Sequence, residues 1–298
     1  MIRVGTCSWT EKTLIQSGEF YPKNVKTSEA RLRYYSEHFD TVEVDSSYYA
    51  IPDRKTAYLW DERTPDNFIF HIKAYRALTG HGVDPKTLPK DIANSLPEKD
   101  RNGKLIYIKE PSILDELSKR FRELLTPLVK SKKLGVIVFQ FPPWFQYSKS
   151  KFDFILECKS KMKNLQVAVE FRHGSWLEPA RRKFLFSFLR ENDLTYITAD
   201  EPQYGTNATI PFVPEVTTDI AYIRFHGRNS ENWLKKGIET SLRYSYEYSD
   251  SELRGFIPAI YSLNKRAKLT CAMFNNCHGG FAIKNALMLK KLIDFVYM

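Results

Sequence analysis

The sequence lacks the short motifs that mark many catalytic and nucleotide-binding sites. No G-x-G-x-x-G follows the first apolar run, and no P-loop, H-E-x-x-H or nucleophile-elbow pattern occurs anywhere in the chain. The usual sequence evidence for a dinucleotide site, a P-loop phosphate site or a catalytic serine or cysteine is therefore missing. Any functional site has to be sought in residues that are distant in the sequence.

Cysteines and long apolar runs are also scarce. The four cysteines show no C-x-x-C spacing, and the segment Met1–Thr6 does not resemble the start of a secretory signal. No apolar run approaches the ~18 residues that span a bilayer. We therefore expect a cytoplasmic protein with reduced thiols and no membrane partner. The cysteines are Cys7, Cys158, Cys271 and Cys277.

Apolar and basic residues are plentiful. Hydrophobic residues make up 43% of the 298 residues, with 20 Phe and 17 Tyr, which is enough for a large core and excludes a disordered chain. Lys and Arg number 45 against 35 Asp and Glu, a formal net charge of +10. This excess favours an anionic partner, either a small molecule or nucleic acid, although a basic surface alone would also account for it.

Short apolar runs alternate with helical patterns along the whole chain. Such alternation indicates a parallel sheet, and eight units in one chain indicate a closed barrel. We predict one α/β domain over residues 1–298, a (β/α)8 TIM barrel, with an open doubly wound sheet as the alternative. The predicted strands are Ile2–Thr6, Thr41–Val44, Phe68–Lys73, Leu134–Phe139, Gln166–Glu170, Thr195–Ala199, Ile220–Phe225 and Leu269–Phe274. The predicted helices are Ala30–His38, Thr56–Arg63, Ile113–Leu128, Phe152–Lys163, Pro179–Glu191, Glu252–Lys265 and Gly280–Val296, with none between the sixth and seventh strands.

Three connections are longer than the usual loops of this fold. They are Ala74–Pro111, Glu201–Asp219 and Gly227–Asp250, and each follows the carboxyl end of a predicted strand. Barrels place their binding loops at that end. We expect these insertions to form a long rim around the mouth of the barrel.

Polar residues recur at the carboxyl ends of the predicted strands. Because side chains alternate between the two faces of a strand, the parity of the apolar residues predicts which polar ones point into the barrel. The predicted inward residues are Glu43 and Asp45, His71 and Lys73, Val138 and Gln140, Glu170 and Arg172, Thr198 and Asp200, and Arg224 and His226. Buried charges are costly unless they are paired, so this layer indicates either a closed network of ion pairs or a ligand site.

The chemistry of these residues suggests separate roles at a site. Glu43 and Glu170 could exchange protons as general acid and base, and His226 could transfer protons. Lys73, Arg172 and Arg224 could hold an anion. A divalent metal is a further alternative for the cofactor, which the sequence leaves unknown, but no local ligand motif supports a metal site. The metal ligands would come from Glu43, Asp45, Glu170, Asp200 and His226.

Four tryptophans follow strands or lie in rim loops. Trp9, Trp144, Trp176 and Trp233 could stack on the base or sugar ring of a ligand, or could pack the loops onto the core. Trp9 and Trp176 are the two that we assign to substrate binding.

Several segments resemble the DUF72 family, also called YecE-like proteins, in the right order along nearly the whole chain. Gly5-Thr6-Cys7-Ser8-Trp9 resembles the opening G-T-S-G-W of the family. The other matching segments are Phe20–Pro22, Leu32–Tyr35, Thr41–Tyr49, Gln140–Pro143, Val169–Trp176, Arg224–Gly227 and Phe274–Asn276. The resemblance implies a TIM barrel and supplies no activity. This chain departs from the family pattern at Asp45, where Asn is usual, and at Cys277-His278, where His usually follows the two asparagines.

Three functional hypotheses follow from these residues. The first is an enzyme, a hydrolase or isomerase, that acts on a phosphorylated or nucleic-acid-like anion at the carboxyl-terminal mouth. The second is a nucleic-acid-binding protein without chemistry, and the third is a scaffold whose polar mouth is a plug of ion pairs. In the first, the substrate-binding residues are Asp45, Lys73, Gln140, Arg172, Asp200, Arg224, Asn275, Asn276, Trp9 and Trp176.

Overall fold

Eight parallel strands close into a barrel in the computed structural model, which describes residues 1–205 and 207–297. Strands adjacent in sequence pair with each other, and β1 pairs with β8 to complete the ring. The predicted TIM barrel is confirmed, and the open sheet is excluded. The strands, each within one residue of its predicted bounds, are β1 Ile2–Thr6, β2 Thr41–Val44, β3 Ile69–Lys73, β4 Leu134–Gln140, β5 Val167–Glu170, β6 Leu194–Asp200, β7 Ile220–Phe225 and β8 Leu269–Phe274.

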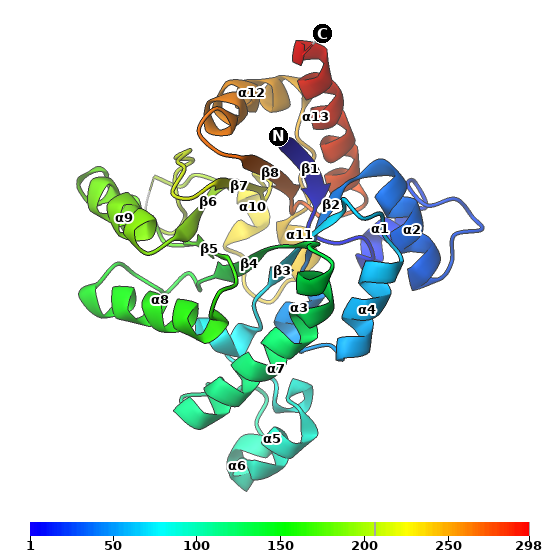
Figure 1. Cartoon of the computed structure of the whole chain (residues 1–298). Coiled ribbons are helices and arrows are strands. Elements are labelled where there is room, and N and C mark those ends of the chain that lie inside the picture. Colours follow the sequence, from blue (N-terminus) through cyan, green and yellow to red (C-terminus); the bar gives the residue numbers. More distant parts are fainter. Residues whose placement is uncertain (206, 298) are drawn as a thin grey trace.

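The predicted helices surround the barrel (Figure 1). They are α2 Ser28–His38, α4 Arg54–Glu62, α7 Pro111–Lys130, α8 Lys149–Met162, α9 Pro179–Glu191, α12 Asp250–Asn264 and α13 Phe281–Tyr297. Helix α12 begins with the capping box of Ser249 and Glu252. As predicted, the described part of the β6–β7 connection contains no helix. In residues 1–205 and 207–297, no helix combines the length and apolar character needed to cross a membrane.

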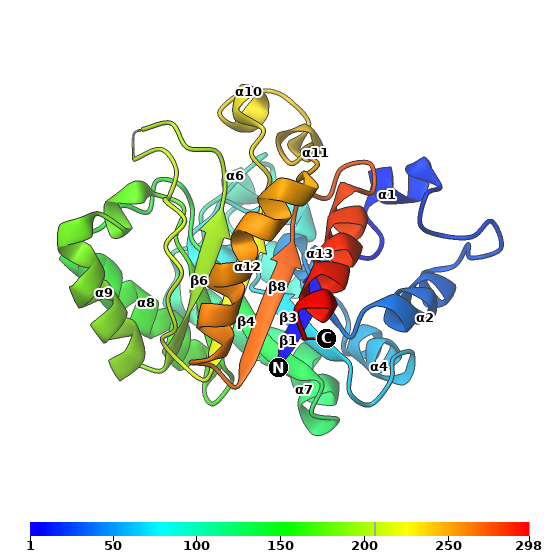
Figure 2. The ribbon, with the colours of Figure 1, turned by 90° about the horizontal axis from the view of Figure 1, so that it is seen from above.

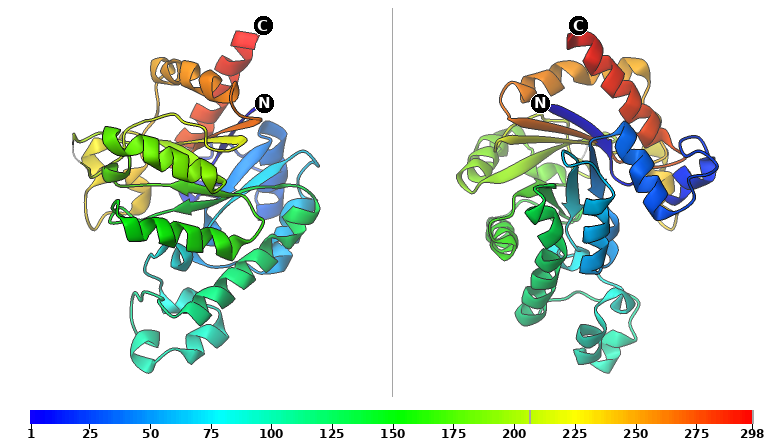
Figure 3. Two further views of the ribbon diagram at one scale, coloured as in Figure 1. Left: turned by 60° about the vertical axis from the view of Figure 1, so that its left-hand side comes forward. Right: turned by 45° about the vertical axis from the view of Figure 1, so that its right-hand side comes forward.

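The long connections follow the carboxyl ends of β3, β6 and β7, as predicted, and carry several of the short helices. Figure 2 shows α10 and α11 beyond the arrowheads of β6 and β8, over the mouth, and Figure 3 shows α5 and α6 projecting outside the ring of helices. The short helices are α1 Lys12–Ser17, α3 Ser46–Tyr49, η1 Arg76–Thr79, η2 Pro85–Thr87, α5 Lys90–Ser95, α6 Glu98–Arg101, η3 Gly174–Trp176, α10 Ser230–Trp233 and α11 Thr240–Arg243.

Small and apolar side chains fill the barrel below the polar mouth. His71 points into this interior, where its Nδ1 accepts a hydrogen bond from Val136 N at 3.1 Å. Burial lowers the pKa of His71 to about 3, so its ring is neutral. A Cβ at Gly135 would lie 2.4 Å from the ring, which explains the glycine beside it. The interior cluster comprises Cys7, Val136, Val138, Ala168, Ile197, Tyr222, Cys271 and Met273.

The parity predicted for β6 is wrong. In the register with β7, Ala199 pairs with Arg224 and Asp200 pairs with Phe225. Arg224 points into the barrel and Phe225 packs among the outer aromatic side chains, so Ala199 faces inward and Asp200 outward. Thr198 also faces outward. The residue of this strand end that reaches the mouth is therefore the next one, Glu201.

The missing helix explains why polar side chains face outward on β6. An irregular segment covers this face, and its backbone and hydroxyl groups need hydrogen-bond partners. Thr217 Oγ1 donates to Leu194 O at 2.6 Å and accepts from Tyr196 N at 2.8 Å. Thr198 Oγ1 donates to Val213 O at 3.5 Å. The parity prediction assumes that an apolar helix face covers the outer side of each strand. Where a polar loop covers that side, the polar residues of the strand face outward.

Candidate functional site

Arg224 of β7 lies at the centre of the mouth and joins two carboxylates from opposite parts of the barrel. Its Nη2 donates to Glu43 Oε1 of β2 at 2.7 Å, and its Nη1 donates to Glu170 Oε2 of β5 at 2.5 Å. All three side chains are fully buried. Tyr222 donates a further hydrogen bond to Glu43 at 2.8 Å, and Gln140 accepts one from Arg224 at 3.2 Å.

The surroundings of these two glutamates shift their pKa values in opposite directions. Burial raises the pKa of Glu43 to about 7, with Asp45 adding to the effect and Arg224 opposing it. Burial acts on Glu170 in the same sense, but Arg224 and His226 outweigh it and hold the pKa of Glu170 well below its usual range. Divergent pKa values in a carboxyl pair are typical of acid–base sites. Glu43 can gain and lose a proton near neutral pH, whereas Glu170 stays ionised.

His226 and Arg172 form the second part of the cluster. His226 Nε2 and Arg172 Nη1 lie 3.0 Å and 2.9 Å from the same atom, Glu170 Oε1. Asn275 Nδ2 lies 2.9 Å from His226 Nδ1, and Arg172 Nη1 lies 3.0 Å from His226 Nε2. Burial lowers the pKa of His226 to about 3, so the ring is neutral here.

Glu201 completes the cluster, and the sequence analysis missed it. Its Oε2 lies 3.0 Å from Arg172 Nη2, and its Oε1 accepts from Ile210 N at 2.7 Å. Burial raises the pKa of Glu201 to about 7. The only sequence signal was that Glu201 follows Asp200 directly. If Ala199 had been assigned to the inner face of β6, the same alternation would have placed Glu201 inward as well.

The buried cations are matched by carboxylates. Lys73 Nζ lies 3.5 Å from Asp45 Oδ1 at the edge of the cluster, and Arg224 Nη2 lies 3.8 Å from the same oxygen. Three cations thus face four carboxylates, a formal charge of −1 when every carboxyl is ionised. A proton on one of the two glutamates with a pKa near 7 brings the cluster to neutrality. The members are Lys73, Arg172, Arg224, Glu43, Asp45, Glu170 and Glu201.

A cavity of about 600 Å³ lies above this cluster and is referred to below as the mouth cavity. Lys73 Nζ and Arg76 Cζ lie 4.8 Å and 5.3 Å from the centroid of the Tyr48 ring in its wall. Arg76 forms no ion pair with any carboxylate in the described part of the chain. The other lining residues are Cys7, Ser8, Thr10, Glu11, Asp45, Ser46, Tyr49, Gln140, Thr240, Ser241, Tyr244, Asn275 and Cys277.

Tyr244 separates the mouth cavity from a smaller one of about 270 Å³. Arg172, Lys236 and Arg243 line the smaller cavity, and none of its lining residues in the described part of the chain is a carboxylate. Trp233 stacks on Arg172, with the guanidinium carbon 5.1 Å from the ring centroid. The rings of Trp233 and Tyr244 lie 6.2 Å and 6.0 Å from His226. The segment that carries α10 and α11 therefore covers the buried histidine.

Three residues assigned to substrate binding lie away from the mouth of the barrel. Asp200 accepts hydrogen bonds from Arg228 at 2.8 Å and Tyr248 at 2.6 Å on the outer side of the barrel. Asn276 donates to Asn285 of α13. Trp176 is fully buried in a stack of aromatic rings and donates to Phe145 O.

The remaining predicted residues come together at the mouth. Lys73, Asp45, Gln140 and Asn275 line the mouth cavity, whereas Glu43, Glu170, Arg224 and His226 are fully buried in the layer that forms its floor. Arg172 lines the smaller cavity. Trp9 lines a third cavity beside the mouth. Within the described residues, no three His, Cys, Asp or Glu side chains are arranged to hold a metal ion.

Comparison with known proteins places the chain in a family. The family model "Protein of unknown function DUF72" matches residues 3–296. The UPF0759 protein YunF of Bacillus subtilis (strain 168) is 31% identical, and the match covers 100% of this chain and 96% of that protein.

Solved structures of the same family are similar over their whole length. A DUF72 family protein of Enterococcus faecalis V583 superposes with a TM-score of 0.80 at 30% identity, covering 99% of this chain and 96% of that chain. A DUF72 family protein of Thermotoga maritima MSB8 gives a TM-score of 0.78 at 31% identity, covering 99% of both chains. With the motifs, the barrel and these matches in agreement, the chain belongs to the DUF72 family.

Proposed function

We propose that this protein is an enzyme that binds a small phosphate-bearing substrate in the mouth cavity and transfers protons on it, as a hydrolase or an isomerase. The observation that carries the proposal is the position of Arg76. It is a guanidinium without a carboxylate partner among the described residues, it lies against Tyr48 beside Lys73, and it lines a cavity of about 600 Å³. A guanidinium and an ammonium at one wall match a phosphate group.

The buried cations have a different role in this proposal. Arg224 and Arg172 are already bound to glutamates, so they hold the floor in place and do not clamp the anion. The anion contacts come from Lys73 and Arg76 at the wall, and Lys236 and Arg243 offer a second cationic surface across Tyr244.

Proton transfer is assigned to the two carboxyls at the end of β2. Asp45 lines the mouth cavity and can reach a substrate, and Glu43 lies two residues earlier in the floor with a pKa of about 7. A group with that pKa is well matched to proton exchange at neutral pH. Neutral His226 and ionised Glu170 keep the floor in one arrangement.

Phosphate binding is the direct test. Inorganic phosphate should bind the wild-type protein in a calorimetric titration, and Arg76→Met should weaken this binding about tenfold to a hundredfold, because a charged hydrogen bond is lost. Arg101→Met, the same change at an exposed position of α6, is the matched control. If phosphate does not bind, or binds wild type and Arg76→Met with equal affinity, the proposal is wrong.

Turnover is tested on a set of sugar phosphates and nucleotides, by release of phosphate and by exchange of substrate hydrogen for solvent deuterium. For a substrate found in this way, Glu43→Gln should lower kcat by about 100-fold, the usual contribution of a positioned acid or base, and change KM little. An unchanged kcat would remove Glu43 from the mechanism.

A row of aromatic rings favours a second candidate, binding of single-stranded nucleic acid. Tyr49, Tyr48, His81 and Trp144 follow one another at centroid distances of 5.1, 5.4 and 5.7 Å, and Tyr49 and Trp144 are exposed. The rings meet edge to face, and a base can stack on the face of each exposed ring. This candidate predicts that an oligonucleotide binds with an affinity that falls steeply with salt, and that Trp144→Ala weakens it. Retention that does not depend on salt would reject it.

A further inference from the structure

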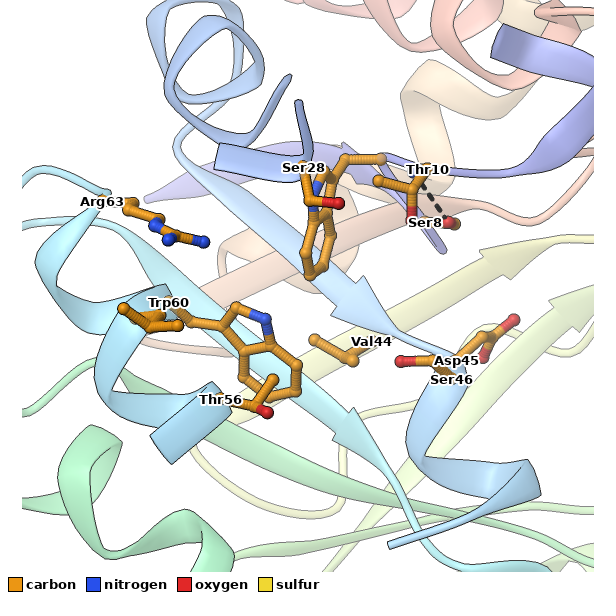
Figure 4. A pocket seen from close by; sticks show the side chains of 11 residues that line it. Ser8, Thr10, Ser28, Val44, Asp45, Ser46, Thr56, Trp60 and Arg63 are labelled. Atoms are coloured by element: carbon orange, nitrogen blue, oxygen red, sulfur yellow. Dashed lines mark hydrogen bonds between the residues drawn. The ribbon is translucent and has the colours of Figure 1, made fainter. Parts of the chain in front are cut away.

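A third cavity, of about 240 Å³, lies beside the mouth between the ends of β1 and β2 and helix α4. In Figure 4, Arg63 lies at one end and Asp45 and Ser46 lie at the other, with Trp60 between them. It shares four lining residues with the mouth cavity, so the two are neighbours. These are Ser8, Thr10, Asp45 and Ser46.

Two indole rings and several hydroxyl groups line this side cavity. Trp9 and Trp60 meet edge to face, with their ring centroids 6.0 Å apart. An indole surface packs against the C–H groups of a sugar ring, while hydroxyls and a carboxylate exchange hydrogen bonds with its hydroxyls. The hydroxyls belong to Ser8, Thr10, Ser28, Ser46 and Thr56, and the carboxylate is that of Asp45.

One buried polar atom on the lining residues, the donor Nε1 of Trp9, has no hydrogen-bond partner within the described part of the chain. Asp45 Oδ1, in the same lining, already faces Lys73 Nζ at 3.5 Å. A buried polar atom without a partner is unfavourable. A ligand hydroxyl that accepts a hydrogen bond from Trp9 Nε1 would remove this cost.

The charge and size of the side cavity favour one neutral ring. Its cation, Arg63, already pairs with Glu29 at 3.0 Å, so no free positive charge is left for a second phosphate. The volume of about 240 Å³ equals the share of roughly eight water molecules at about 30 Å³ each. That space suits a single ring better than a chain.

We infer that the side cavity is a subsite for one neutral sugar ring, whose charged group extends past Asp45 into the mouth cavity. The link between the two groups rests on the proposed function. The ring subsite itself does not, because Trp9, Trp60 and Ser28 line the side cavity alone and are not among the phosphate contacts.

Ligand-observed NMR with the free neutral sugars D-glucose and D-ribose tests the subsite. Saturation transfer to the ring protons of at least one sugar is expected for the wild-type protein. Trp9→Phe removes the indole donor and should weaken that sugar about threefold to tenfold, the effect of one hydrogen bond. Ser28→Trp, a change at an exposed position that fills the cavity opening, should abolish the signal. Ser112→Trp, the same change in the first turn of α7, is the control.

The same samples separate this inference from the proposed function. If a sugar shows saturation transfer that Ser28→Trp abolishes, and inorganic phosphate does not bind, the subsite is supported and the phosphate proposal is contradicted. Phosphate binding without transfer to either sugar overturns the subsite and leaves the phosphate proposal standing. Transfer that is equal in wild type and Ser28→Trp also overturns the subsite.

Discussion

At the scale of single residues, the pKa of Glu43 makes stability depend on pH in a predictable direction. Its pKa is about 7 in the folded protein against 4.5 as its ordinary value, so folding tightens proton binding. The resulting stabilisation is complete below about pH 4.5 and is lost as the pH rises through about 7. Glu43→Gln resembles the protonated form at every pH. Relative to wild type, it should gain about 2–3 kcal/mol of unfolding free energy between pH 5 and pH 8.

Urea unfolding of both proteins at the two pH values measures this gain. Glu98→Gln, at an exposed position of α6, should show almost none. If the wild type and Glu43→Gln differ equally at pH 5 and pH 8, the carboxyl of Glu43 does not titrate in this range.

The charge of Asp45 raises the pKa of Glu43. Asp45→Asn should therefore lower the pKa of Glu43, because the repulsion between the two carboxylates is removed. A carboxyl titration of Glu43 by carbon-13 NMR would show the midpoint moving to lower pH. A midpoint that stays in place or rises would contradict the electrostatic account of this pair.

At the scale of elements, one threonine of the β6–β7 connection is hydrogen-bonded to the backbone at the start of β6. Thr217 bonds to Leu194 O and Tyr196 N, and it is 6% exposed. Thr217→Val leaves both backbone groups without this partner and should lower the unfolding free energy by about 1–3 kcal/mol. Chemical denaturation measures the loss. Thr126→Val on α7, whose hydroxyl makes one bond of 3.4 Å within its own helix, should cost much less.

The strands and helices could be predicted because each has its own apolar pattern, and the order of such patterns determines a barrel. Parity then identified the inward residues on β2, β3, β5 and β7, where apolar helices cover the outer face. It failed on β6 because the covering segment is a polar loop, so Asp200 was chosen in place of Glu201.

Residues in irregular segments could not be predicted from the sequence, for a different reason. Arg76 lies three residues beyond the end of β3, in η1, and its position against Tyr48 depends on two separate loops. No periodicity specifies such a contact. The same holds for Trp233 and Tyr244, whose placement over His226 follows from the path of the chain after Gly227. Gly227 has φ +86°, and a Cβ there would lie 2.7 Å from Tyr246 Cβ.

At the scale of the whole molecule, charge is distributed unevenly. The chain carries +10 overall, yet its buried mouth cluster carries a formal charge of −1 when every carboxyl is ionised. The excess of positive charge therefore lies at the rim and on the surface, where Arg76, Lys236 and Arg243 line cavities. A ligand attracted by the overall charge would meet these rim cations before the buried arginines.

The pairing of Arg224 across the barrel leads to a prediction about the molecule as a whole. Arg224→Met leaves Glu43 and Glu170 buried without their shared cation and should lower the unfolding free energy by about 3–5 kcal/mol. Adding Glu43→Gln and Glu170→Gln removes the two carboxylate charges that have lost Arg224 and should restore most of the lost stability. Denaturant unfolding of the single and triple variants at pH 8 measures both effects. If the triple variant recovers its stability yet no longer binds phosphate or turns over a substrate, the mouth cluster serves function as well as structure. If it keeps both properties, the cluster is a structural plug, and the site lies in the rim residues alone.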